Sequence, residues 1–242
     1  MILLAIDVGN SRIKWGVREN GAWLRRGVTA TAEAEALCQS FRELPRPERI
    51  LIAHVAGDAV KVKLAAALPS GIDPQWVVSR KEQCGVRSSY AEPHQLGPDR
   101  WAALIGARHL YAGACVVVNA GTTMTVDALS AESIFLGGSI VAGFDLMRTA
   151  LAANTAQLAW REGGFSFFPD NTADAIASGA LNALAGAVDR MWRYVVDTGE
   201  GDPLIVLAGG NASLLLPRLN GRVEVVDNLV LEGLARIGAS DG

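Results

Sequence analysis

The sequence predicts an α/β protein built from two similar halves, and three observations support this prediction. Each half opens with an apolar segment that ends at an acidic or amide residue, Asp7 or Asn119, just before a glycine turn. A strand-like alternating segment follows each turn, and helical patterns then alternate with short apolar segments. The 242 residues are enough for two domains of this kind.

The first half reads as a three-stranded meander followed by alternating helices and strands. Asn20 and Gly21 favour a type I′ hairpin turn between the second and third strands. The expected strands are 2–8, 12–18, 22–28, 49–56 and 75–78. The expected helices are 31–44, 58–68 and 100–111, and a polar loop is expected over 80–97.

The second half repeats this pattern. Residues 6–11 (IDVGNS) align with residues 118–123 (VNAGTT), 112 positions later, with their glycines in step. The expected strands are 115–119, 123–129, 134–140, 204–207 and 223–226, and the expected helices are 145–160, 172–196, 213–218 and 229–237. We therefore expect domains at 1–113 and 114–242, with a cleft faced by both glycine turns.

Composition disfavours several classes of function. A net charge of −3 and a pI near 5.7 argue against a nucleic-acid-binding surface. No apolar segment approaches the roughly 20 residues of a membrane span, and the first one is too short for a signal peptide. The cysteines and histidines lack disulfide or metal spacing: Cys38, Cys84, Cys115, His54, His94 and His109. A reduced, cytoplasmic location is expected.

Both glycine turns are suited to binding an anion, because a tight turn presents backbone N–H groups. Ser11 and Thr122 add hydroxyl donors, and Arg12 or Lys14 adds positive charge. Asp7 could hold Mg²⁺ through water, since Mg²⁺ favours carboxylates and retains water ligands. The alternative is two ordinary hairpins, and neither a P-loop nor a G-x-G-x-x-G motif is present.

Two further motifs allow a chemical and a structural interpretation. In LGPDRW, Asp99 either accepts a proton from a substrate hydroxyl that attacks a phosphate, or caps the helix that follows. Arg100 either holds an acidic substrate or is a solvated first-turn residue. In VLAGGN, Gly209 and Gly210 either admit an adenosine close to the backbone or form a common strand-to-helix turn.

A resemblance to a known family rests on several motifs in order: IDVGNSRIK, LGPDRW, NAGTTMTVD, GGSIVAGFDLMRTAL…NTAQL, NTADAIASGA and VLAGGNA. Together they resemble the type III pantothenate kinase family over nearly the whole chain. The resemblance implies two ribonuclease-H-like domains in tandem, as in actin, sugar kinases and chaperone ATPases, with a nucleotide cleft between them. It also implies transfer of the ATP γ-phosphate to pantothenate, the first step of coenzyme A synthesis. The implied enzyme is a homodimer that uses Mg²⁺ and a monovalent cation, K⁺ or NH₄⁺.

The same resemblance implies roles for individual residues. The first ATP-phosphate loop would comprise Asp7, Val8, Gly9, Asn10, Ser11, Arg12, Ile13 and Lys14. The remaining nucleotide contacts would come from Gly121, Thr122, Gly209 and Gly210. The pantothenate contacts would be Tyr90, Gly97, Pro98, Asp99 as proton acceptor, Arg100, and Thr172 of the neighbouring subunit.

Asn119 departs from the family pattern, because the second loop usually begins with an Asp that binds the monovalent cation. The resemblance therefore leaves the cation site in question here. Two rival functions stay open at this point: a non-catalytic regulator similar to Bvg accessory factor, and another phosphotransferase or phosphatase of the superfamily.

The long helix expected at 172–196 carries small and apolar residues at helical spacing. This stripe would pack either on a second subunit or inside its own core. Its members are Ala175, Ile176, Ala180, Leu184, Ala187 and Met191.

Overall fold

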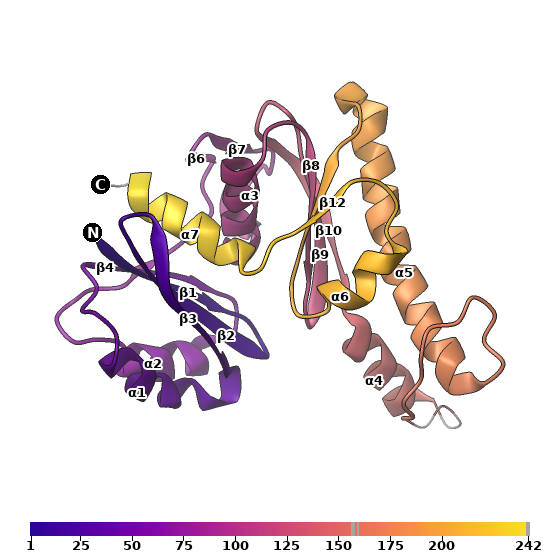
Figure 1. The fold of residues 1–242 in the computed structure, drawn as a ribbon, viewed down its shortest axis with the longest axis horizontal. Helices are drawn as coiled ribbons and strands as arrows, with labels where there is room; N and C mark the ends of the chain where they lie inside the picture. The colour runs from indigo at the N-terminus through magenta and orange to yellow at the C-terminus, as the bar shows by residue number, and fades with distance from the viewer. Residues whose placement is uncertain (156–157, 159, 241–242) are drawn as a thin grey trace. The chain divides into compact units, whose positions relative to one another are not determined.

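The computed structural model describes residues 1–155, 158 and 160–240, which form two compact units. Unit 1 contains Met1–Ala112 together with the chain from Asn228 onward, and unit 2 contains Gly113–Asp227. Figure 1 shows both units along the colour gradient, with the closing helix, in yellow, beside the indigo N-terminal strands. This division differs from the sequence-based boundary, which placed all residues after 113 in one C-terminal domain.

Unit 1 is built on a five-stranded sheet in the order β3-β2-β1-β4-β5. Its strands are β1 (Ile2–Val8), β2 (Arg12–Glu19), β3 (Ala22–Ala30), β4 (Arg49–His54) and β5 (Gln75–Trp76). The first three strands are antiparallel neighbours, and β4 lies parallel to β1. Asn20 and Gly21 both adopt positive φ angles, 48° and 87°, which confirms the predicted hairpin turn.

Helices cover both faces of this sheet. On one face, α1 (Leu37–Arg42) and α2 (Asp58–Ala67) enclose a core of β-strand side chains. On the other face lie α3 (Pro98–Leu110) and α7 (Leu229–Ser240). A Cβ at Gly233 of α7 would collide with the backbone of Ala102 in α3, so a glycine is required at this crossing. This close packing joins the end of the chain to unit 1.

Two expectations in unit 1 need correction. The helix expected at 31–44 begins as a 3₁₀ segment, η1 (Thr31–Ala36), before it becomes α1. The loop expected over 80–97 contains a short hairpin of β6 (Glu82–Gln83) and β7 (Val86–Ser88) and a 3₁₀ turn, η2 (Pro93–Gln95).

Unit 2 repeats the sheet of unit 1. Its strands lie in the order β12-β11-β8-β9-β10, and they are β8 (Cys115–Ala120), β9 (Thr123–Leu129), β10 (Ile134–Ala142), β11 (Leu204–Ala208) and β12 (Val223–Val225). The β8-β9-β10 meander is antiparallel, and β11 lies parallel to β8. Each strand of the five-stranded sheet in unit 1 thus has a counterpart in unit 2, which confirms the predicted duplication.

The helices of unit 2 are α4 (Phe144–Asn154), α5 (Thr172–Val195) with the π-helical η3 (Val196–Glu200), and α6 (Ala212–Leu215) with η4 (Leu216–Arg218). The helix expected at 145–160 ends early, because Thr155 is already extended; residues 156, 157 and 159 lie outside the described part of the chain. The core joins the β8 and β9 side chains to α5. None of the described helices is both long enough and apolar enough to cross a membrane.

Candidate active site

The first glycine turn connects β1 to β2 and is closed by hydrogen bonds from within unit 1. The Gly9 N–H donates to the Arg12 carbonyl oxygen at 3.1 Å. Thr31, which is buried, donates its N–H to the Ser11 carbonyl at 3.1 Å and its hydroxyl to the Gly9 carbonyl at 2.7 Å. These bonds occupy the carbonyl side of the turn, while the side chains of Asn10 and Ser11 are exposed.

Asp7, Lys14 and Asp99 come together beside this turn. Asp7 stands directly opposite Lys14 across the antiparallel β1–β2 pair. Burial and, to a smaller extent, the nearby Asp99 carboxylate together raise the pKa of Asp7 to about 7, against the opposing effect of Lys14. Two carboxyl groups from distant parts of the sequence therefore share one electrostatic environment, as the sequence interpretation requires of a reacting centre.

Asp99 lies in the first turn of α3, but it is not the N-cap. Gly97 holds the cap position and Pro98 follows it, so the N-cap interpretation is wrong. A Cβ at Gly97 would stand only 2.6 Å from Asp99 Oδ1, so the glycine leaves room for this carboxylate. Burial raises the pKa of Asp99, against the opposing effect of the backbone N–H groups of Arg100 and Asp99 and of the Arg100 charge.

Arg100 and Tyr90 complete the unit 1 part of the predicted site. Arg100 is only 6% exposed, so its interpretation as a solvated first-turn residue is wrong. Tyr90 is half-buried just after β7, and its N–H donates to the Ser88 hydroxyl at 3.3 Å. No group of three or more His, Cys, Asp or Glu side chains suited to a metal ion occurs among the described residues.

The second glycine turn, between β8 and β9, is packed by backbone from two other segments. Gly143 donates its N–H to the Thr122 carbonyl at 2.9 Å, and a Cβ at Gly143 would collide with the Gly121 carbonyl. Gly209 has a φ of 103°, and a Cβ there would collide with the Ala120 backbone. The structure therefore brings the candidate residues Gly121, Thr122 and Gly209 together at one edge of the unit 2 sheet.

Asn119 occupies the last position but one of β8. It lies opposite Thr125 of β9 and Ala208 of β11, and it is half-buried. Its register matches that of Asp7 in unit 1, which lies opposite Lys14 and beside Ala53. The aligned positions thus differ in charge while their places in the two sheets agree.

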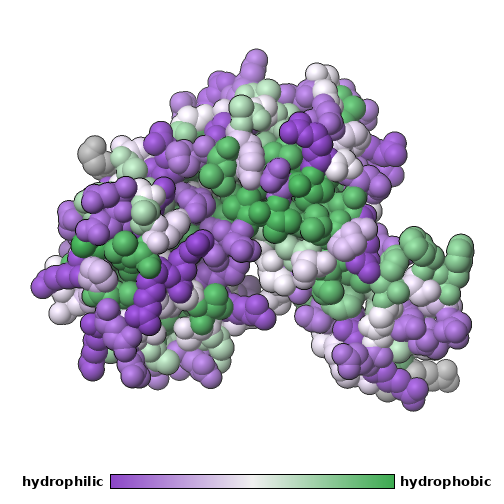
Figure 2. Space-filling view, in the orientation of Figure 1, coloured by the Kyte–Doolittle hydropathy of each residue, from purple (hydrophilic) through white to green (hydrophobic). Residues whose placement is uncertain are grey.

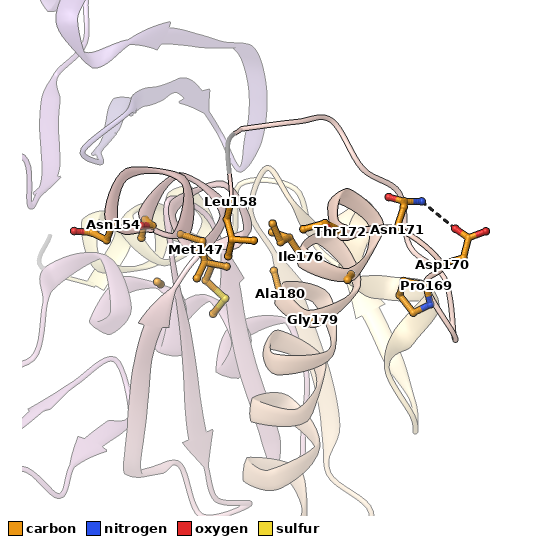
Figure 3. A pocket seen from close by; sticks show the side chains of 14 residues that line it. Met147, Asn154, Leu158, Pro169, Asp170, Asn171, Thr172, Ile176, Gly179 and Ala180 are labelled. Atoms are coloured by element: carbon orange, nitrogen blue, oxygen red, sulfur yellow. Dashed lines mark hydrogen bonds between the residues drawn. The ribbon is translucent and has the colours of Figure 1, made fainter. Parts of the chain in front are cut away.

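Thr172 is the first residue of α5 and lies on the lining of a cavity in unit 2. This cavity has a volume of about 1060 Å³ and lies between α4, α5 and the connecting chain. Figure 3 shows Met147, Leu158 and Ile176 around its apolar interior and Thr172 on the first turn of α5.

The stripe along α5 is divided between two environments. Ala180 and Leu184 are buried in the core of unit 2, and Ala187 and Met191 pack against that core. Ala180 and Leu184 therefore follow the alternative, a core within the same chain, and the packing of Ala187 and Met191 favours it as well. The remaining members, Ala175 and Ile176, line the cavity instead.

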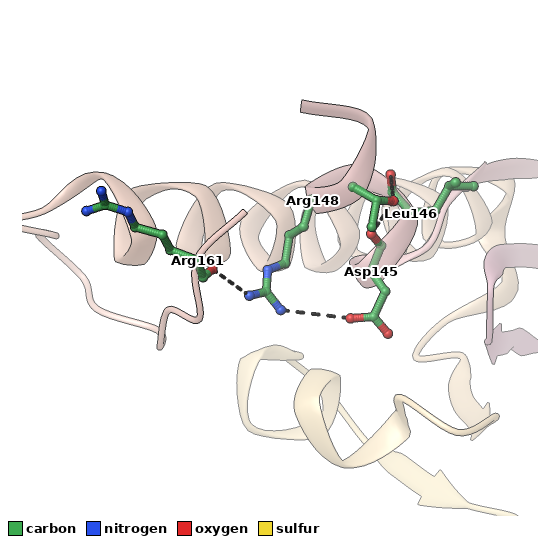
Figure 4. Close-up of polar contacts among 5 residues, drawn as sticks. Asp145, Leu146, Arg148 and Arg161 are labelled. Carbon is green, nitrogen blue, oxygen red and sulfur yellow. Dashed lines mark hydrogen bonds and ion pairs between the residues drawn. The ribbon is translucent and has the colours of Figure 1, made fainter. Parts of the chain in front are cut away.

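Arg148 is a buried residue that sequence reasoning missed. Its guanidinium lies 4.8 Å from the ring centre of Phe144 and 4.3 Å from that of Trp160. It also donates to the Arg161 carbonyl at 3.1 Å and pairs with Asp145 at 3.8 Å (Figure 4). The i, i+4 spacing of Phe144 and Arg148 was the available signal, but the partner beyond the helix was not predictable locally.

Two units with the same sheet topology, each with a glycine turn after its first strand, form the fold class that actin-like ATPases and sugar kinases share. Solved structures agree at the level of the fold. A putative 2-dehydro-3-deoxygalactonokinase from Sinorhizobium meliloti has a TM-score of 0.61 at 17% identity, with 99% of each chain covered. An activator of 2-hydroxyisocaproyl-CoA dehydratase from Clostridium difficile, with bound ADPNP, has a TM-score of 0.55 at 13% identity, covering 98% of this chain and 92% of the other.

The chain belongs to the type III pantothenate kinase family. The family model matches residues 3–194. A type III pantothenate kinase from Aromatoleum aromaticum is 48% identical, with 99% of each chain covered, and one from Nitrosospira multiformis is 46% identical over 98% of this chain and 90% of that protein. The predicted resemblance is confirmed, and the chain is a kinase; the non-catalytic regulator is not favoured.

Proposed function

We propose that Asp99 accepts the proton of the pantothenate hydroxyl in the reaction that family membership assigns to this chain. That reaction is the ATP-dependent phosphorylation of pantothenate to 4′-phosphopantothenate, in coenzyme A synthesis. The observation that carries the proposal is the shared environment of Asp99, Asp7 and Lys14 beside the first glycine turn. A raised pKa suits Asp99 to this role, because it brings a carboxylate closer to the basicity needed near neutral pH.

In this mechanism the hydroxyl oxygen of pantothenate forms a bond to the γ-phosphorus of ATP. The bond from that phosphorus to the β–γ bridging oxygen breaks, ADP leaves, and the hydroxyl proton passes to Asp99. Phosphoryl transfer depends mainly on positioning and on charge stabilisation. Lys14 and the turn at Gly9–Ser11 would supply that stabilisation at the phosphates.

The residues present fit a magnesium ion held through water at Asp7. The raised pKa of Asp7 shows that its charged form lacks sufficient compensation from Lys14 alone. Mg²⁺ is commonly held by one or two carboxylates plus waters and substrate phosphates, so no larger acidic cluster is needed. When bound, the ion would neutralise phosphate charge, and Asp7 would orient it.

The other nucleotide contacts proposed are Gly121, Thr122, Gly209 and Gly210 of unit 2. Their support is local: the backbone of this edge is packed so closely that glycine is required at Gly209. The Gly209 turn is thereby fixed against the end of β8, beside the second glycine turn. Tyr90, Gly97, Pro98 and Arg100 are the pantothenate contacts proposed in unit 1, where Arg100 would offer a positive charge to the carboxylate of this acidic substrate.

The protein would act in the cytoplasm as a homodimer, with Thr172 reaching the pantothenate of its partner. The exposed face of α5 supports close approach of a second copy, because Gly179, Ala183 and Gly186 leave it without bulk. Hydrophobic side chains are also exposed on the segment just before α5 (Figure 2), where Phe167 and Phe168 are 84% and 92% exposed. Mixing Thr172→Arg with Asp99→Asn subunits tests this: activity should return in hybrid dimers, which keep one intact site.

The direct test of the proposed function is ADP release from ATP and Mg²⁺ with and without pantothenate. We expect pantothenate-dependent ADP from the wild type, and a kcat lower by roughly 10²–10⁴-fold in Asp99→Asn. The fold should survive, because Asn keeps an oxygen acceptor and carries no charge that burial would destabilise. Asp58→Asn, a first-turn aspartate of α2, is the matched control and should keep full activity. A wild type without pantothenate-dependent ADP would overturn the kinase assignment.

A further inference from the structure

We propose that Asp174 is a positioning residue that fixes Thr172 for pantothenate binding. The proposal rests on the proposed function, because it assumes that Thr172 contacts pantothenate. Thr172 itself is exposed at the start of α5. Its position must therefore be set by the backbone on either side of it, and that backbone is held by Asp174.

The Asp174 carboxylate joins two segments that flank the cavity. Its Oδ1 accepts the Gly164 N–H at 2.7 Å, and its Oδ2 accepts a hydrogen bond from Asn171 Nδ2 at 2.7 Å. The Asp174 N–H in turn donates to Asn171 Oδ1 at 3.0 Å, so Asn171 caps α5. Asn171 directly precedes Thr172, and this reciprocal pair spans it.

A second set of contacts holds the same chain from the other side. A Cβ at Gly163 would collide with the Ala173 backbone, so the strap (residues 160–171) runs directly against the residue after Thr172. The Ser166 N–H donates to the Ser178 hydroxyl at 2.9 Å, one turn further along α5. Thr172 thus lies between two neighbours, Asn171 and Ala173, that are both fixed to the strap.

The charge of Asp174 is matched to this task. The Gly164 N–H and the Asn171 side chain lower its pKa, so it remains ionised and offers two acceptor oxygens at neutral pH. An acidic residue in the first turn is also favoured by the helix dipole. Ordering the strap in advance lowers the entropy that pantothenate binding must otherwise offset.

Asparagine has nearly the same size as aspartate but only one acceptor oxygen. Asp174→Asn therefore tests the need for two acceptor oxygens without changing the size of the side chain. Asp174→Asn keeps one acceptor oxygen, but its NH₂ group must face either Gly164 N–H or Asn171 Nδ2, both of which are donors. We expect the KM for pantothenate to rise roughly three- to tenfold, with kcat and the KM for ATP within twofold of the wild type. Asp174→Glu keeps both acceptors at a capping-box position and should recover most of the loss.

Asp189→Asn is the matched control, because Asp189 is on the same helix and also accepts a hydrogen bond from an asparagine, Asn220, at 3.2 Å. It should change neither constant. Hydrogen exchange gives a second measurement that needs no catalysis. The amides of Gly164 and Ser166 should exchange faster in Asp174→Asn than in Asp189→Asn.

The outcomes separate this inference from the proposed function. If the wild type is active and Asp174→Asn alters kcat and both KM values together, Asp174 is merely structural and the inference is wrong. Unchanged pantothenate KM and unchanged amide exchange would overturn it as well. If the wild type shows no pantothenate-dependent ADP, the proposed function and this inference both fail, and faster exchange of the two amides would show only that Asp174 orders the strap.

Discussion

The two glycine turns are built to one plan and closed by different means. In unit 1, Thr31 donates its N–H to the Ser11 carbonyl; in unit 2, Gly143, 112 positions after Thr31, donates its N–H to the Thr122 carbonyl, one position before the residue aligned with Ser11. Thr31 adds a hydroxyl bond to Gly9, whereas Gly143 has no room for any side chain. The two turns are thus closed by similar backbone hydrogen bonds whose acceptors are offset by one residue, and one turn depends on a side chain while the other depends on close backbone contact.

The residue two positions before each turn glycine also differs between the two units, in charge. Asp7 carries a carboxyl group with a raised pKa next to Lys14 and Asp99, while Asn119 at the aligned position is neutral and lies opposite Thr125. The first turn therefore depends on the charge of nearby side chains, and the second depends on close backbone packing. Substitutions at either turn test whether charge at the first and packing at the second account for this difference.

Asp7→Asn makes the first turn resemble the second. We expect Mg²⁺-ATP binding to weaken by about 10²-fold or more, because the carboxylate that orients the ion is lost, while pantothenate binding changes much less. Calorimetry with each ligand alone measures both. Equal losses for the two ligands would instead indicate misfolding.

Asp7→Asn weakens Mg²⁺-ATP binding but should raise the free energy of unfolding at alkaline pH. A carboxyl group whose pKa is raised to about 7 in the folded state binds its proton more tightly there than when unfolded. Its contribution is favourable below the unfolded pKa and is lost as the pH rises toward about 7. Asp7→Asn should therefore be more stable than the wild type at pH 8 and lose that advantage near pH 4, as measured by urea unfolding.

Gly143→Ala tests whether the second turn depends on close backbone contact. The added Cβ would meet the carbonyl oxygens of Gly121 and Thr122, so we expect a loss of about 3 kcal/mol in the free energy of unfolding. Ala65→Ser is the control, because Ala65 is exposed on α2, away from both turns. That control should change the free energy of unfolding by less than about 0.5 kcal/mol. Equal stability of the two variants would contradict the packing argument.

Thr31→Val tests the side-chain closure of the first turn. It keeps the shape but removes the buried hydroxyl bond to the Gly9 carbonyl, at a cost of about 1–2 kcal/mol. Thr31→Ser retains the hydroxyl and should lose less. Denaturant unfolding of both variants measures the difference, and a valine variant as stable as the serine one would refute the role of the hydroxyl.

Asn119→Asp makes the second turn resemble the first and should have the smallest effect. The neutral amide of the wild type predicts weak or unselective activation by K⁺ or NH₄⁺, and an added carboxylate should increase it by a few-fold. Turnover is compared in K⁺, NH₄⁺ and Na⁺ at constant ionic strength. Tight, K⁺-selective activation of the wild type would contradict this prediction.

The sequence predicted those elements whose boundaries are determined by the local pattern of apolar residues and turns. The strands at 2–8 and 123–129 were predicted to the residue, because apolar runs bounded by glycine turns leave little choice. The pairing of the two turns followed from one short alignment, and the proximity of Asp7 and Asp99 was implied only by the separate roles assigned to them in one reaction, magnesium binding and proton acceptance.

What the sequence could not give depends on contacts between distant segments. Asp99 looks like an N-cap in isolation, but Gly97 takes that position so that the carboxylate can turn back beside it. The apolar stripe of α5 has the same spacing whether it faces a core or a partner, and most of it faces the core. Arg148 was overlooked because its stacking partner Trp160 lies twelve residues later, beyond the end of α4.

The return of α7 to unit 1 bears on the order in which the chain matures on the ribosome. Unit 2 is one continuous segment, so all of its strands are synthesised before α7. Unit 1 must wait with the α3 face of its sheet uncovered until Gly233 can close against Ala102. The part of the protein made first is thus the part completed last, and nascent chains stalled before residue 229 would expose an apolar surface to chaperones.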